Sequence, residues 1–310
     1  MAGETQLVVG AGAVGRRVAE RLVERGDHVR LATRSGAELP GAHPVTADAA
    51  DAAELTAAVD GAQTIFICTG PRSYTTEEWE RAWPPVFRAA IAAARDTRAR
   101  LVVTGNLYPY GPLGGPMTEE SPEHPATGKG RVRHEGWAAL KAATDAGELR
   151  AAEVRASDFF GPGVAIESHL GERFFVPVLK SRTAYIVGDP AVPHSWSYVD
   201  DIAATLIAAA DWQGPWGHVW HVPSGRPHSR DEIAATLNEW FGSHGRTRTM
   251  PQWALQAAGL VRPQFRGIAE ESWQFRHPFI VDASETERML GVHATDWGDA
   301  LRTTAESYLR

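Results

Sequence analysis

The sequence predicts an α/β fold built on a parallel, doubly wound sheet, and three observations support this prediction. Short apolar segments alternate with segments of helical spacing through the first half of the chain. The first apolar segment, 6–9, runs directly into a glycine-rich turn and then into a helix. Loops rich in glycine and proline follow the later apolar segments. Alternation of this kind indicates a parallel sheet that helices cover on both faces.

The predicted elements follow one another in a regular order. Strands are expected at 6–9, 28–32, 44–46, 64–68 and 101–103, with a sixth beginning at 153–155, and helices at 16–23, 52–59, 76–94 and 130–146. Because Pro84 and Pro85 lie in the middle of a predicted helix, we expect a break or kink there. The alternation lapses from Val164 onward. The segment 197–203 leads into a helix that we expect to return to the sheet, and 214–310 reads as a smaller α+β unit with a strand at 217–221.

The glycine turn has a clear chemical meaning. Gly10 allows a tight turn, Gly12 lacks a Cβ and so lets a diphosphate approach the backbone, and Gly15 lets the helix pack closely on the sheet. The helix N-terminus adds free N–H groups and a partial positive charge. A strand, a GxGxxG turn and a helix in this order predict a dinucleotide site, formed by Gly10, Gly12, Ala13, Val14 and Gly15.

Composition and charge exclude several classes of partner. The net charge of −7, without a long basic run, argues against nucleic-acid binding. The single cysteine, Cys68, lies in an apolar run and fits a core position in a reducing cytoplasm. We find no leader and no apolar span of about 18 residues, so we expect a cytoplasmic protein with no membrane partner. His218 and His221 would point to opposite faces of a strand without a third ligand, so no metal site is expected.

Aromatic residues are concentrated in the second half of the chain. Eight of the 11 tryptophans follow residue 190. A packed aromatic core explains this better than a pocket for a flat or hydrophobic ligand, although both interpretations are open.

Several blocks, in this order, resemble the extended short-chain dehydrogenase/reductase family, in its NAD-dependent epimerase/dehydratase group. They are the glycine turn, Asp48, Thr69-Gly70-Pro71, Tyr110-Gly111, Arg155 with Phe160-Gly161-Pro162, and 198–203. The resemblance implies a Rossmann-like domain over 1–163, to which 196–212 returns, and a smaller C-terminal substrate domain mostly over 164–310. It also implies a homodimer through the helices 76–94 and 130–146. The apolar face through Trp137 and Leu140 is equally explained by packing on the sheet.

The chain departs from this family at the positions that carry its chemistry. Val9 occupies the first glycine position of the family's GxxGxxG turn. The family's proton donor is a tyrosine followed four residues later by lysine, and no tyrosine of this chain has lysine at that spacing. Aligned through the following helix, the tyrosine position falls on Lys129 and the lysine position on Arg133. The family's serine or threonine falls on Asn106.

The expected cofactor is NADP(H), with NAD(H) as the alternative. The end of the second strand has no carboxylate to bind an adenosine ribose, and Arg34 there can pair with a 2′-phosphate. Arg34 could equally be a solvated surface charge. By the resemblance, Asp48 accepts from the adenine amino group, although it could also cap the following helix. Thr69, Gly70 and Pro71 follow the fourth strand and join this predicted cofactor site.

The predicted catalytic residues are Lys129, Asn106 and Tyr108. Lys129 is expected to protonate or stabilise the substrate oxygen with help from Asn106, and its proximity to Arg133 favours reduction. A solvated loop lysine is the competing interpretation. Tyr108 and Tyr110 are alternative donors. Arg133 cannot release its proton, but it can donate hydrogen bonds to the nicotinamide ribose.

Four residues are expected to contact substrate: Tyr110, Asp158, Phe160 and Trp196. Asp158 stands where the family commonly has asparagine, near the nicotinamide end, and could instead cap a turn.

Three functions fit these features. The first is an NADP(H)-dependent oxidoreductase that reduces a small organic carbonyl at an active site without the Tyr-x-x-x-Lys pair. The second is a nucleotide-sugar epimerase or dehydratase, which the missing tyrosine disfavours. The third is a non-catalytic NADP(H)-binding sensor or regulator.

Overall fold

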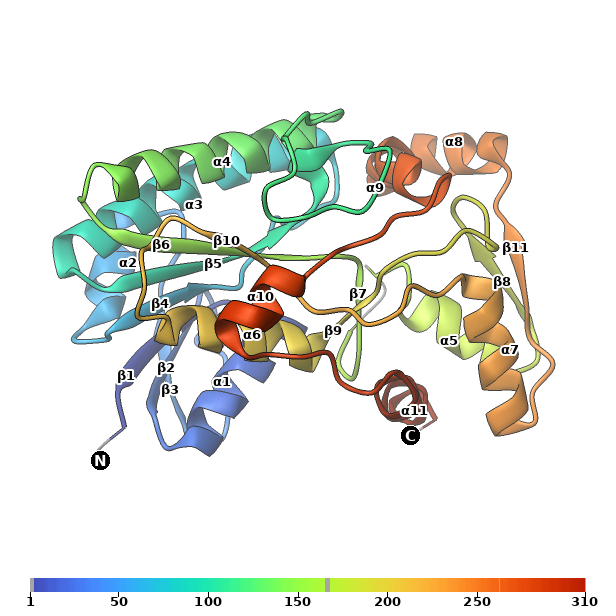
Figure 1. The fold of residues 1–310 in the computed structure, drawn as a ribbon, viewed down its shortest axis with the longest axis horizontal. Helices are drawn as coiled ribbons and strands as arrows, with labels where there is room; N and C mark the ends of the chain where they lie inside the picture. Colours follow the sequence, from blue (N-terminus) through green and yellow to red (C-terminus); the bar gives the residue numbers. More distant parts are fainter. Residues whose placement is uncertain (1–2, 165–167, 262, 310) are drawn as a thin grey trace.

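The central feature of the fold is a parallel sheet of seven strands in the order β10-β6-β5-β4-β1-β2-β3 (Figure 1). The structure is a computed structural model that describes residues 3–164, 168–261 and 263–309. The strands are β1 Thr5–Val9, β2 His28–Thr33, β3 Ala42–Thr46, β4 Thr64–Ile67, β5 Arg100–Asn106, β6 Arg150–Ala156 and β10 Val219–His221. All six neighbouring pairs are parallel, so the carboxyl ends of the strands meet at one edge. This confirms the predicted doubly wound α/β fold.

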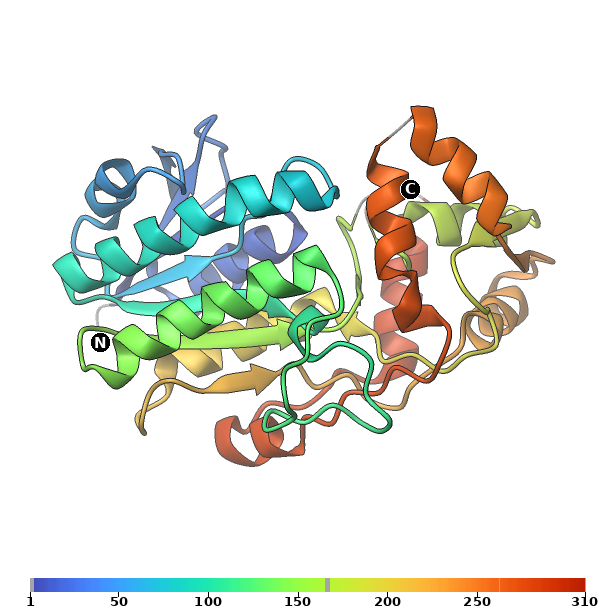
Figure 2. The same cartoon turned by 90° about the horizontal axis from the view of Figure 1, so that it is seen from above.

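Helices cover both faces of the sheet. They are α1 Ala13–Arg25 and α6 Val199–Asp211 on one face, and α2 Ala52–Val59, α3 Thr76–Thr97 and α4 Gly128–Asp145 on the other. Successive residues of a strand point to opposite faces. In β1, Leu7 and Val9 therefore join the core beneath α2, α3 and α4, whereas Val8 joins the core beneath α1 and α6. Figure 2 shows α3 and α4 running side by side over the sheet.

The second half of the chain adds short elements beside the carboxyl edge of the sheet. They are α5 Glu172–Leu179, β8 Thr183–Ile186, α7 Arg230–Phe241, β11 Arg246–Thr249, α8 Gln252–Val261, α9 Gln264–Glu270, the 3-10 helix η2 Glu271–Phe275, α10 Ser284–Leu290 and α11 Trp297–Ser307. Two short pairs, β8 with β11 and β7 Phe159–Phe160 with β9 Ser197–Tyr198, are also parallel. A core of their own includes Phe160, Trp196 and Phe275, as the aromatic-core interpretation predicts.

Three details differ from the sequence prediction. β10, expected in the smaller C-terminal unit, pairs with β6 and forms an edge of the main sheet. α3 continues through Pro84 and Pro85 without a break, because buried Trp79, Trp83 and Phe87 hold one face of it against the core. α1 begins three residues earlier than expected, at Ala13, directly after the turn.

α6 packs against α1, β5 and β6, as expected for the segment 196–212. The domain boundary at residue 163 stays a prediction. No helix among the described residues is both long and apolar enough to span a membrane. Trp137 and Leu140 are buried within the chain's own core, which favours packing on the sheet as the reason for that apolar face.

Candidate active site and cofactor groove

The glycine turn has the backbone geometry that a diphosphate site requires. Gly10 has a φ of +106°, and a Cβ on it would lie 2.7 Å from the carbonyl oxygen of Cys68. A Cβ on Gly15 would lie 2.1 Å from the carbonyl oxygen of Gly10, so the helix packs closely against the turn at this glycine. By contrast, a Cβ on Gly12 would meet nothing within 4 Å. Gly12 is the N-cap of α1 and supplies no side-chain cap, so the first N–H groups of the helix face open space.

A cavity of about 670 Å³ follows this turn along the carboxyl ends of β1, β2, β3 and β4. It brings together most of the predicted cofactor residues, namely Gly10, Arg34, Asp48, Thr69, Gly70 and Pro71. A second cavity of about 540 Å³ lies beside Gly12 and Ala13. The two volumes, the open space at Gly12 and the uncapped helix fit an extended dinucleotide.

The charges of the larger cavity favour an anion. Arg34 is exposed and forms no ion pair among the described residues, and Arg72 also lines the cavity, whereas Arg81 pairs with Glu78 of the same wall at 2.8 Å. Asp51, not Asp48, caps α2, because its side chain accepts from the N–H groups of Ala53 and Glu54. Asp48 accepts only from the N–H of Ala50 among the described residues, and it remains in the cavity wall.

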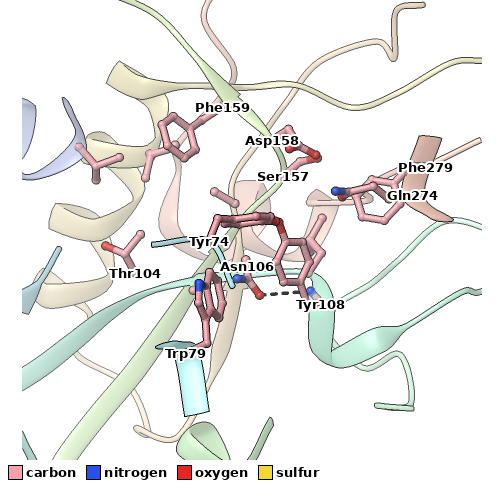
Figure 3. Close-up of a pocket in the computed structure, with 15 residues that line it drawn as sticks. Tyr74, Trp79, Thr104, Asn106, Tyr108, Ser157, Asp158, Phe159, Gln274 and Phe279 are labelled. Carbon is pink, nitrogen blue, oxygen red and sulfur yellow. Dashed lines mark hydrogen bonds between the residues drawn. The ribbon is translucent and has the colours of Figure 1, made fainter. Parts of the chain in front are cut away.

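A third cavity, of about 190 Å³, lies at the carboxyl ends of β5 and β6 (Figure 3). Val14, Asn106, Tyr108 and Asp158, all predicted site residues, line it. Tyr74, Trp79, Phe159, Gln274 and Phe279 complete most of the wall. Because Val14 belongs to the GxGxxG segment, this cavity lies directly beside the predicted cofactor turn.

Tyr108 and Tyr74 form a hydrogen-bonded pair of hydroxyl groups in this cavity. Burial raises the pKa of both phenols well above the usual value, so both stay protonated at neutral pH. Asn106 accepts the backbone N–H of Tyr108 through Oδ1 at 3.2 Å, which orients its amide and keeps the NH₂ group as a donor.

Asp158 is the acidic residue of the cavity wall, and its Oδ2 accepts from Nε2 of His194 at 2.9 Å. Although burial opposes ionisation, the hydrogen bond and nearby positive charges hold the pKa of Asp158 below its usual value. Burial lowers the pKa of His194, which is stacked between Phe275 and Phe279 at 4.8 Å from each ring. We therefore describe the pair as a carboxylate with a neutral imidazole.

Lys129 is buried rather than solvated, which excludes the loop-lysine interpretation. Its Nζ donates to the carbonyl oxygen of Gly267 at 3.1 Å and lies 3.0 Å from Glu270 and 3.3 Å from Glu271. The ammonium thus joins the start of α4 to α9 and η2. It does not line the 190 Å³ cavity, whereas Tyr108 does.

Arg133 is also buried, and its NH2 nitrogen donates to Glu153 at 2.7 Å and to the carbonyl oxygen of Thr104 at 2.8 Å. Its guanidinium stacks over Trp83 at 4.3 Å. Its Nε has no hydrogen-bond partner among the described residues, so one donor stays free.

Three of the four predicted substrate residues lie outside the small cavity. The hydroxyl of Tyr110 lies 2.8 Å from Nε2 of His221, Phe160 packs between Tyr198 and Trp297, and Trp196 donates to the carbonyl oxygen of His228. Alternation along β7 explains one of these differences, since it turns Phe159 toward the cavity and Phe160 away from it.

Sequence reasoning missed Tyr74, Gln274 and Phe279, which reach the cavity from distant segments. Tyr74 comes from the loop after β4 and Gln274 from η2. The sequence contains one indication that Tyr74 lies near the site, because Tyr74 follows the predicted Thr69-Gly70-Pro71 block at the carboxyl edge of the sheet.

Comparison with known proteins identifies the family. The model of the NAD dependent epimerase/dehydratase family matches residues 6–222. The chain belongs to this family, which confirms the resemblance and the class of NAD(P)-dependent oxidoreductases and epimerases.

Individual relatives agree with this assignment. A dTDP-6-deoxy-L-talose 4-dehydrogenase (NAD(P)(+)) from Kitasatospora kifunensis is 28% identical over 221 residues, which are 66% of this chain and 70% of that protein. Epimerase Mth375 from Methanothermobacter thermautotrophicus superposes with a TM-score of 0.82 at 18% identity, covering 99% of this chain and 92% of the other. MoeE5 in complex with UDP-glucuronic acid and NAD gives 0.81 at 19% identity, with 99% of both chains covered. The two structures are evidence for the fold.

Proposed function

We propose that the protein is an NADP(H)-dependent oxidoreductase that reduces a small organic carbonyl compound. The size of the cavity beside Tyr108 and Asn106 carries this proposal. Its volume is about 190 Å³, whereas clefts for drug-sized ligands measure about 300–1,000 Å³. Five aromatic side chains contribute to its wall, and Tyr108 and Asn106 supply two neutral hydrogen-bond donors for a substrate oxygen.

The residues of this cavity take the following roles. When bound, the cofactor supplies the hydride that joins the carbonyl carbon. Tyr108 donates its hydroxyl proton to the carbonyl oxygen as the C=O bond becomes C–OH, and Asn106 holds the developing negative charge with its amide. Tyr74 fixes the orientation of the Tyr108 hydroxyl through their hydrogen bond. Water returns the proton to Tyr108 after the product leaves.

Lys129 and Arg133 support this arrangement from outside the cavity. Lys129 anchors η2, which contributes Gln274 to the wall, and so acts as a positioning residue in place of the predicted donor. Arg133 holds the carbonyl of Thr104, another residue of the wall. Because Arg133 is buried and lines none of these cavities, we assign it a positioning role in place of the predicted contact with the nicotinamide ribose.

NADP(H) is the preferred cofactor in this proposal because Arg34 lines the larger cavity and has no ion-pair partner among the described residues. Charge-assisted hydrogen bonds to a 2′-phosphate contribute about 1.5–3 kcal/mol. Arg34→Glu should therefore weaken NADPH binding at least tenfold, roughly, while NADH binding changes little. Arg98→Glu, at the exposed C-cap of α3, is the control. Equal weakening for both cofactors would contradict the preference.

A second candidate is a reaction on a nucleotide sugar. The dehydrogenase of Kitasatospora kifunensis is named for a dTDP-deoxysugar, and MoeE5 binds UDP-glucuronic acid and NAD. This activity would require the 190 Å³ cavity to open, because a nucleotide sugar exceeds its volume.

Turnover assays separate the candidates. We expect NADPH oxidation with small aldehydes or ketones and none with dTDP- or UDP-sugars. Tyr108→Phe should lower kcat by about 10²–10⁴-fold while NADPH still binds. Turnover of nucleotide sugars alone would replace the proposal with the second candidate. Tight NADP(H) binding with no turnover of either class would support a sensor.

A further inference from the structure

The small cavity combines several aromatic side chains with one carboxylate, that of Asp158, among its described lining residues. Tyr74, Trp79, Tyr108, Phe159 and Phe279 provide five aromatic rings. Asp158 lies in the loop between β6 and β7, and its side chain is 11% exposed. Figure 3 shows Asp158 and Phe159 on one chain segment at the cavity, opposite Trp79.

The charge of Asp158 is not cancelled inside the cavity. None of the described residues that line the cavity is lysine, arginine or histidine. Its one hydrogen bond among the described residues comes from His194 to Oδ2, and His194 is kept neutral by burial. No hydrogen bond from a described residue reaches Oδ1 of Asp158. This oxygen is also not one of the fully buried polar atoms without a partner, so it keeps some accessible surface.

Two buried cations lie outside the cavity wall. Lys129 pairs with both Glu270 and Glu271, so this cluster contributes no positive charge to the cavity. Arg230 lies behind the wall, 3% exposed, with its guanidinium over the ring of Phe275 at 4.6 Å and a hydrogen bond to the carbonyl oxygen of Val187. Its positive charge helps to lower the pKa of Asp158, but it forms no ion pair with Asp158 among the described residues, so Asp158 keeps an oxygen for a ligand.

We propose that the cavity selects a carbonyl substrate that carries a cationic amine or quaternary ammonium group, which the aromatic rings and Asp158 bind together. This inference rests on the proposed carbonyl reductase function and names its substrate class. Aromatic rings attract cations through the negative charge of their faces, most strongly where water is excluded. A carboxylate whose hydrogen-bond partner is a neutral imidazole keeps its negative charge, so it adds direct attraction in the same water-poor space and repels anionic substrates.

The test compares ligands of equal shape and different charge. Choline and 3,3-dimethylbutan-1-ol differ in one atom, nitrogen for carbon, and model the alcohol products of such substrates. In calorimetry with saturating NADPH, the protein should bind choline at least about tenfold more tightly than the neutral alcohol. Asp158→Asn should bring the two affinities within about threefold of each other. Asp96→Asn, an exposed aspartate of α3, should keep the wild-type ratio.

Turnover provides a second readout with the matching aldehydes, betaine aldehyde and 3,3-dimethylbutanal. The ratio of their kcat/KM values should fall in Asp158→Asn by about the same factor as the binding ratio. The binding comparison does not need turnover, so an enzyme that reduces neither aldehyde contradicts the proposed function without deciding the charge preference.

Three results would overturn the inference. The first is equal affinity of the wild-type protein for choline and its neutral analogue, which requires no variant and so stands even when Asp158→Asn fails to fold. The second is an unchanged preference in folded Asp158→Asn. The third is a changed ratio of NADP⁺ to NADPH affinity in that variant with the choline preference intact, because the carboxylate would then serve the oxidised nicotinamide ring.

Discussion

The ammonium of Lys129 lies 3.3 Å from a carboxylate oxygen of Glu271, and neither side chain is exposed. Their positions are 142 residues apart, so this ion pair joins the start of α4 to η2. Removing one partner of a buried pair leaves an uncompensated charge and costs about 3–5 kcal/mol, whereas replacing both with apolar residues costs much less. Replacing both residues of the pair can therefore distinguish a positioning role of Lys129 from a catalytic role, because the ammonium group is removed without leaving Glu271 as an unpaired charge.

Lys129→Met should lower the free energy of unfolding by about 3–5 kcal/mol in urea titrations at pH 8. Burial raises the pKa of Glu271, so its carboxyl takes up a proton more readily without Lys129, and the loss should be smaller at pH 5. Lys129→Met/Glu271→Met should recover most of the stability and also the turnover. Lys180→Met, at an exposed position, is the control. If the double variant is stable and binds NADPH but has no turnover, the positioning role is wrong and Lys129 acts as the proton donor.

Gly12 and Gly15 should respond to substitution in opposite ways. Gly12→Ser places its Cβ in open space and supplies a good N-cap, so stability should hold within about 0.5 kcal/mol. The same Cβ occupies the approach of the diphosphate, so NADPH affinity should fall at least tenfold, roughly. Gly15→Ala places a Cβ 2.1 Å from the carbonyl oxygen of Gly10 and should lower the melting temperature. If folded Gly12→Ser binds NADPH with the wild-type affinity, the diphosphate does not bind beside Gly12.

The glycine turn and the sheet could be predicted because their signals are local. Apolar strands, the GxGxxG spacing and helix spacing each depend on residues within one short segment. The cavity wall could not be predicted in the same way, since Tyr74, Tyr108 and Gln274 come from three separate segments. Lys129 matched the family's tyrosine position in alignment, but its direction is set by Glu270 and Glu271, which no local pattern connects to it.

His221 should make the fold sensitive to acid. Its Nε2 lies 2.8 Å from the Tyr110 hydroxyl and its Nδ1 3.0 Å from the carbonyl oxygen of Asp282, which assigns the single proton to Nδ1. Burial lowers the pKa of His221 to about 4. Between this value and about 6.5 the unfolded chain binds the proton and the folded chain does not, so this contribution to stability is complete above pH 6.5 and is lost on acidification.

The expected loss from His221 between pH 7 and pH 5 is about 2 kcal/mol. Urea titrations at pH 7, 6 and 5 measure it. His221→Gln keeps a donor and an acceptor without titrating, so its free energy of unfolding should decline less over this range. His244→Gln, at a position without a buried partner for its ring among the described residues, should retain the wild-type slope. Identical slopes for all three proteins would show that His221 is protonated in the folded state as readily as in the unfolded chain.

The protonated phenols of Tyr74 and Tyr108 should favour carbonyl reduction over alcohol oxidation, and Tyr74 should also affect the rate. Because burial raises the pKa of Tyr74 and Tyr108, both are proton donors and neither is a ready base at neutral pH. A phenol of raised pKa is still a stronger acid than the alcohol formed, so carbonyl reduction should stay nearly constant from pH 6 to about 9, while alcohol oxidation at pH 7 should be slow. Tyr74→Phe removes the hydroxyl that orients Tyr108 and should lower kcat for reduction by about tenfold with NADPH affinity unchanged. Tyr185→Phe, an exposed tyrosine of β8, should have no effect. A reduction rate that falls with a midpoint well below pH 9 would mean that the phenol ionises easily, and the donor would then have to be sought outside the Tyr74–Tyr108 pair.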